Sequence, residues 1–180
     1  MTLTAIPAAG AIVRGGVFAA LMNERMPVSV RKSADQALAT ASTVLQNVTG
    51  LVLPVAAGAV YDGEVDVAAV CSSGSTEDVK YGFTFPSGAV LDFFPIGPAT
   101  SVTAGSGDGE FTARIAASSG STTTSHGVVA SSVSTNTVIR FRLTMGSTAG
   151  NLQLQAAQLN SGANTITIRV GSKMTMCQVG

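Results

Sequence analysis

Charged residues are scarce in this sequence. Only 11% of its 180 residues are Asp, Glu, Lys or Arg, against about 25% in typical soluble domains. Ten basic residues balance ten acidic ones, so the formal net charge is zero. A neutral chain without a basic patch argues against binding nucleic acid through phosphate contacts. Interface cores are depleted in Lys, Glu and Asp, so the shortage predicts that partner subunits cover much of the surface.

The sequence also lacks an apolar run of about 18 residues, although 46% of its residues are hydrophobic. The longest apolar stretch, LVLPVAAGAVY, contains Pro54 and Gly58 and is followed at once by Asp62. The N-terminal apolar stretch has no basic region before it and is interrupted by Pro7 and Gly10. We therefore expect neither a membrane span nor a signal peptide.

Side chains that carry chemistry are few. Cys71 and Cys177 are far apart without metal-ligand spacing, and we expect two buried free thiols, with one long-range disulfide as the alternative. The single histidine, His126, lies in a Ser/Thr-rich stretch, and no Gly-x-Ser-x-Gly elbow is present. We expect an exposed loop histidine, no catalytic or cofactor-binding residue and no enzyme. Tryptophan is absent, and the Phe residues between 83 and 94 are more typical of a core than of a ligand platform.

Three carboxylates alternate along one strand and share its face: Asp62, Glu64 and Asp66. Carboxylates stacked in this way can bind a hard cation when a neighbouring loop adds oxygen ligands. Cross-strand ion pairing explains the same pattern more simply. We expect these acids to pair with basic residues of neighbouring strands, for which the candidates are Arg140, Arg142 and Lys80.

Two regions differ in character. Residues 1–39 are expected to form an N-terminal arm with one short helix in VRGGVFAALMNERM, whose apolar stripe and basic ends make a candidate anchor on a neighbouring protein or on the same domain. The anchor residues are Val13, Arg14, Val17, Phe18, Leu21, Met22 and Arg25. Residues 40–180 alternate with a period of two between Gly, Pro and Ser breaks. This pattern predicts an all-β domain, an antiparallel β-sandwich of jelly-roll type.

The stretch NLQLQAAQL at 151–159 alternates leucines with amides and has no charge on its polar face. Amides donate and accept hydrogen bonds without the desolvation cost of a charge. We therefore predict that Gln153, Gln155 and Gln158 contribute to a subunit interface. A solvated amide face is the alternative interpretation.

A resemblance accompanies these patterns. Residues 28–179 resemble small virion proteins of tailed phages of actinobacteria, commonly called minor tail or head-decoration proteins. The shared features are Leu-Pro-Val-Ala-Ala at 53–57, an Asp-Val-Lys strand leading to Phe-x-x-Pro-x-Gly-Ala, a Gly-x-Leu-x-x-x-x-Ala-Gln segment, and Gly-Ser-x-Met at 171–174. The resemblance implies a β-sandwich surface module that assembles as an oligomer on a virion, without catalytic motif.

Two placements follow from that implication. The protein is expected to decorate the capsid as a homo-oligomer, most simply a trimer, made in the host bacterial cytoplasm and anchored on the major capsid protein by its N-terminal segment. Alternatively it is a minor tail, fibre or tip protein that presents loops 97–110 and 116–137 to host surface glycans. The sequence contains no coiled-coil heptad or β-helix repeat to serve as a tail shaft, which favours decoration.

Overall fold

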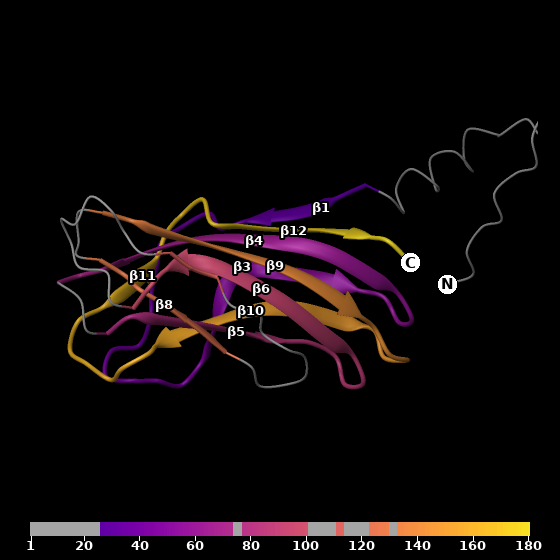
Figure 1. Cartoon of the computed structure of the whole chain (residues 1–180). Coiled ribbons are helices and arrows are strands. Elements are labelled where there is room, and N and C mark those ends of the chain that lie inside the picture. The colour runs from indigo at the N-terminus through magenta and orange to yellow at the C-terminus, as the bar shows by residue number, and fades with distance from the viewer. Residues whose placement is uncertain (1–25, 74–76, 101–110, 114–122, 130–132) are drawn as a thin grey trace, which may run out of the picture.

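The computed structural model describes residues 26–73, 77–100, 111–113, 123–129 and 133–180. These residues fold as two antiparallel sheets packed face to face (Figure 1), which confirms the predicted all-β sandwich. The predicted helix at 13–26 lies almost entirely outside the described residues. The strands are β1 Val28–Arg31, β2 Gln36–Ala37, β3 Gln46–Val55, β4 Val60–Cys71, β5 Val79–Thr84, β6 Val90–Pro98, β7 Phe111–Ala113, β8 Thr124–His126, β9 Thr135–Thr144, β10 Gly150–Gln158, β11 Ile166–Ile168 and β12 Lys173–Gln178.

The larger sheet has the order β1-β12-β4-β9-β6-β7, and β11 joins it by pairing with both β4 and β2. The smaller sheet has the order β3-β10-β5-β8. Neighbours in both sheets are mostly far apart in sequence, as when β9 pairs with β4 and β10 with β3. The alternation in the sequence therefore fixes which face of each strand is buried, whereas the pairing depends on long-range contacts.

The core lies between the sheets and is filled by the apolar phase of each strand. Val65 and Ile139 of the larger sheet and Leu152 and Leu154 of the smaller one are fully buried. Three phenylalanines bridge the layers, because the Phe83 ring of β5 lies 5.6 Å from that of Phe93 and 6.0 Å from that of Phe141, centroid to centroid. Such tilted aromatic contacts stabilise a core beyond the area that they bury.

The predicted role of the phenylalanines is only partly confirmed. Phe83 and Phe93 are buried, and Phe85 packs against the core from a half-buried position. Phe94 instead points outward and is 48% exposed. Consecutive residues on a strand face opposite sides, so Phe93 and Phe94 cannot both enter the same core.

Residues 28–38 belong to the sandwich. β1 pairs with β12, β2 pairs with β11, and Leu38 is buried in the core. The sandwich therefore begins by Val28, although the sequence placed its start at residue 40. These strands escape a pattern search because one is four residues long, the other is two, and both have largely exposed side chains.

The segment Asn47-Val48-Thr49-Gly50 forms a bulge inside β3. Pairing with β10 shifts from Gln153 opposite Val52 to Gln155 opposite Asn47. Gly50 takes a φ of +84° there, in the region where a side chain is strained. The bulge positions the amides of β10 described below.

Candidate functional site: the two outer faces of the sandwich

The outer face of the larger sheet carries a network of cross-strand ion pairs, as the sequence predicted. Arg142 donates from Nε to Asp62 Oδ1 at 2.7 Å and from Nη2 to Oδ2 at 2.8 Å. Arg140 Nε lies 3.3 Å from Glu64 Oε2. The bond from Arg142 holds the pKa of the Asp62 carboxyl below its usual range. These pairs are exposed, so they fix side-chain positions more than they stabilise the fold.

The remaining acid of this row is also engaged. Asp66 Oδ1 accepts a hydrogen bond of 2.6 Å from Asn136 Nδ2, and Lys173 lies opposite Asp66 in the register of β12. Lys80, the other basic candidate, lies on β5 in the smaller sheet, so it does not face the acidic strand. In the part of the chain that the structure describes, no group of three or more His, Cys, Asp or Glu is placed to hold a metal ion.

A shallow, open hollow of about 570 Å³ lies on the same face. It is bordered by Asp62, Glu64 and Arg140 of the ion-pair network. Lys173, Thr175 and Cys177 of β12 complete this border. The Thr175 hydroxyl already bonds Ser29 Oγ at 2.9 Å. Pro27, Phe141 and Met176 also line the hollow, so apolar groups lie there beside the ion-paired charges.

Strand β6 of this face presents exposed apolar side chains, with Asp92 between two of them opposite Arg142. On β6, the outward side chains of Val90, Phe94 and Ile96 are each more than two-fifths exposed. Phe94 lies opposite Arg140, and Ile96 lies opposite Val138. The exposed Phe94 ring therefore lies beside Arg140 of β9.

The outer face of the smaller sheet is different, because it is almost free of charge. Lys80 is the only Lys, Arg, Asp or Glu in β3, β5, β8 and β10. Cross-strand partners share a face, so the register places Asn47, Gln155 and Gly82 in one outward row and Val52, Gln153 and Thr84 in the next. A third row pairs Asn151 with Pro54. We call this surface the uncharged face.

Leu45 covers part of the uncharged face. A Cβ on Gly82 would lie 2.9 Å from Leu45 Cδ1, so the missing side chain of Gly82 makes room for this leucine. The neighbouring Val44 is 74% exposed. The face therefore combines amides and hydroxyls with an aliphatic patch.

The three predicted interface glutamines have unlike positions. Gln153 is half-buried, and its Nε2 donates to the carbonyls of Val48, Leu51 and Leu154 at the bulge. Gln155 is half-buried on the uncharged face, where its Nε2 donates to Asn47 Oδ1 at 2.9 Å. Whether either glutamine contacts another subunit stays a prediction.

Gln158 does not reach the surface. It is fully buried, and its Nε2 donates to the carbonyls of Gly162 and Asn164 while its Oε1 accepts from the backbone N–H of Ser42 and Gly162. The physical reason is its phase, because Gln158 falls in step with Leu152 and Leu154 and so turns inward. Its amide joins two loops of one chain.

The prediction of an exposed loop histidine is wrong. His126 is fully buried in β8, which pairs with β5 through Val79. Its Nε2 lies 2.9 Å from Thr124 Oγ1. Gly97 makes room for the imidazole ring, because a Cβ on Gly97 would lie 2.8 Å from His126 Nδ1 and 2.7 Å from Thr137 Oγ1. The Ser/Thr composition of the segment favours a loop, but the Thr124 hydroxyl is itself buried beside His126.

Two adjacent carboxylates are buried at the start of β5. Glu77 Oε1 accepts from Asn164 Nδ2 at 2.8 Å, and Asp78 Oδ1 accepts from the Val128 N–H at 3.3 Å. Burial raises the pKa of Asp78 to about 6, a shift opposed by the Val128 bond and increased by Glu77. These acids join the turn before β11 and the segment after β8 to the sandwich.

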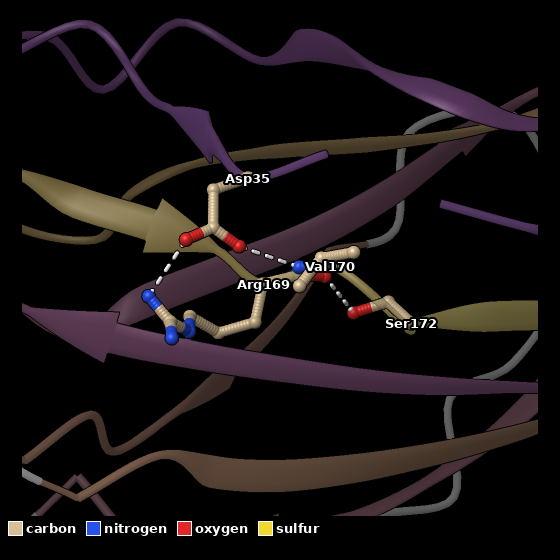
Figure 2. A network of polar contacts seen from close by, with 4 residues as sticks. All are labelled: Asp35, Arg169, Val170 and Ser172. Atoms are coloured by element: carbon tan, nitrogen blue, oxygen red, sulfur yellow. Dashed lines mark hydrogen bonds and ion pairs between the residues drawn. The ribbon is translucent and has the colours of Figure 1, made fainter. Parts of the chain in front are cut away.

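A second polar network ties the start of the described chain to the turn between β11 and β12. Figure 2 shows Asp35 accepting from Arg169 Nη1 at 2.7 Å and from the Val170 N–H at 2.6 Å. Ser172 Oγ donates to the Arg169 carbonyl. Nearby, burial lowers the pKa of the Lys32 ammonium, and Asp35 opposes that shift. The network is structural and confirms that residues 31–35 are integral to the domain.

The anchor residues lie outside the described residues, so their role stays a prediction: Val13, Arg14, Val17, Phe18, Leu21, Met22 and Arg25. Within the described residues Cys71 and Cys177 form no disulfide; Cys71 is buried as expected, whereas Cys177 is only half-buried. Within the described ranges, no helix is long and apolar enough to cross a membrane.

Sequence reasoning missed Asn47 and Thr84 as members of the uncharged face. Both come from strands distant in sequence from β10, and only the register of the sheet brings them beside Gln155 and Gln153. The available signal was the lack of charge across 46–55 and 150–158, two segments that become neighbouring strands.

Comparison with known proteins identifies no family for this chain. No protein-family model matches the chain, and no curated protein matches it in sequence. Among solved structures, a chain in the structure of infectious bursal disease virus Gt strain is 11% identical, with a TM-score of 0.23 over 86% of this chain. This chain spans 40% of the length of that one. A TM-score this low does not define a shared fold.

Proposed function

We propose that this chain is a structural protein of a tailed-phage virion, a homo-oligomeric β-sandwich on the particle surface that acts by binding and not by catalysis. The observation that supports the proposal is the uncharged face, in which Lys80 is the only formally charged residue of four strands. Depletion of charge is typical of the core of a protein interface. The resemblance of residues 28–179 to small phage virion proteins supplies the biological setting.

Capsid decoration is the preferred placement. In this role, residues 1–25 dock on the major capsid protein while the sandwich lies on the outside of the head. The structure sharpens the choice of that segment, because Val28–Arg31 is a strand of the sandwich and the buried Lys32 donates to Gln36 Oε1 and the Thr49 carbonyl. An anchor that is separate from the domain must therefore lie before Val28.

A minor tail or tip protein that contacts host glycans is the second candidate. The observation in its favour is the half-exposed Phe94 ring beside Arg140, because an exposed aromatic ring offers an apolar platform to a sugar. Glycan-array binding that is lost in Phe94→Ala and kept in Val90→Ala would support this placement. Equal binding by Phe94→Ala and the wild-type protein would remove its structural support.

The test of the preferred placement uses particles separated into heads and tails. Mass spectrometry should find the protein in the head fraction, and purified protein should bind heads that lack it. A variant without residues 1–25 should keep the wild-type unfolding midpoint and lose binding to heads. Recovery only with tails would contradict decoration, and absence from both fractions would contradict a virion role. Wild-type occupancy by the truncated protein would refute the anchor.

A further inference from the structure

Apart from Lys80, which lies in the next row opposite Ala157, the polar side chains of the uncharged face are of a special kind. Asn47, Thr84, Asn151 and Gln155 each carry a hydrogen-bond donor and an acceptor in one group. A two-fold axis brings identical residues together, so a group with both functions can bond to its own copy. Two identical charges meeting there would repel each other without solvent to screen them. The composition of this face therefore suits contact with a second copy.

The side-chain amides of Gln155 and Asn47 are hydrogen-bonded to each other on this face. Their mutual bond uses one N–H of Gln155 Nε2 and the Asn47 Oδ1 acceptor. Among the described residues, neither Gln155 Oε1 nor Asn47 Nδ2 has a hydrogen-bond partner. An acceptor and a donor thus remain side by side, and a two-fold rotation would place each against its complement on the second copy.

The size of the face indicates the strength of the contact. Strands β3, β10, β5 and β8 contain 10, 9, 6 and 3 residues. At about 3.4 Å per residue and about 4.8 Å between strands, they cover a plane of about 450 Å². Leu45 and the exposed Val44 add to it. A standard interface buries about 800 Å² per partner, so this face suits a weak contact.

We propose that the uncharged face pairs with the same face of a second copy about a two-fold axis near Gln155. The proposal rests on the proposed function, in which that face is an interface, and it names the partner. An isologous contact joins copies in twos, so the assembly should contain an even number of chains. This differs from the trimer expected from the sequence.

Light scattering across a concentration series tests the contact with a charge swap. Gln155→Glu and Gln155→Lys each place like charges across the axis and should weaken association by about tenfold or more. An equal mixture of the two variants should associate again, because each negative side chain then meets a positive one. The control is Thr144→Glu on the opposite, charged face, which should keep the wild-type mass.

Each result decides the proposal. A wild-type protein that is monomeric at every soluble concentration overturns it, as does a trimer as the only assembly. A mixture that stays monomeric while the wild type associates also overturns it, because the contact then does not join two copies at Gln155. If either variant lowers the unfolding midpoint, Thr84→Glu and Thr84→Lys repeat the swap from the exposed end of β5. Recovery from virions tests the proposed function separately, since self-association holds or fails whether or not the protein is on a particle.

Discussion

Asp78 gives the sharpest prediction about stability. Its side chain is 5% exposed, lies beside the buried Glu77, and receives the Val128 N–H at a long 3.3 Å. Its φ of +25° lies in a region that Asn and Asp tolerate better than most residues. Asp78→Asn removes the charge and preserves the size, the backbone conformation and the acceptor for Val128. The substitution therefore isolates the cost of burying the carboxylate.

The direction follows from the pKa. The folded protein raises the pKa of Asp78 from 3.8 to about 6, so it holds this proton more tightly than the unfolded chain does. The wild-type protein should gain stability as the pH falls through 6 toward 3.8, and the charged carboxylate should cost stability above pH 6. The shift corresponds to about 3 kcal/mol, at about 1.36 kcal/mol per pKa unit.

Urea unfolding at a series of pH values measures the effect. Asp78→Asn should be more stable than the wild type at about pH 7.5, by up to about 3 kcal/mol, and the two should converge near pH 4. Asp92→Asn, at an exposed carboxylate on β6, is the matched control and should leave the difference unchanged. A variant that is no more stable than the wild type at neutral pH would refute the argument from burial.

Three further predictions concern the fold. Gly63→Ala places a Cβ 2.6 Å from the Thr175 carbonyl oxygen and should destabilise the protein by about 2 kcal/mol in urea unfolding. Gln158→Leu leaves buried backbone groups without partners and should cost about 2–4 kcal/mol, with faster hydrogen exchange in the loops that it joins. Deleting residues 1–25 should leave the unfolding midpoint unchanged, whereas deleting residues 1–32 should lower it; equal midpoints would contradict the place of β1 in the sheet.

The sequence predicts the fold where a local rule decides the outcome. Alternation along Val60–Cys71 and Thr135–Thr144 identified both the buried and the charged face of two central strands, and the ion pairs of Asp62 and Glu64 followed. It does not predict β1, because a four-residue strand is defined by its partner β12 and not by its own pattern. Pairing across more than a hundred residues is a tertiary property.

The uncharged face was likewise predictable only where local alternation decides the position of a side chain. Alternation placed Gln153 and Gln155 on one face, and it also places Gln158 on the opposite one, where the structure buries it. His126 could not be located from its Ser/Thr neighbours, because its burial depends on Gly97 of a distant strand. The row that joins Asn47 to Gln155 arises from the register and the bulge at Gly50, which no local pattern encodes.

The central claim is that the uncharged face of β3, β10, β5 and β8 is an interface between copies. The most direct measurement is the mass of the wild-type protein by light scattering over a concentration series. We expect the mass to rise from one chain of 18.0 kDa to an even number of chains, and to rise least in Gln155→Glu. A protein that remains monomeric up to its solubility limit, or one whose assembly is unaffected by Gln155→Glu, would contradict the claim.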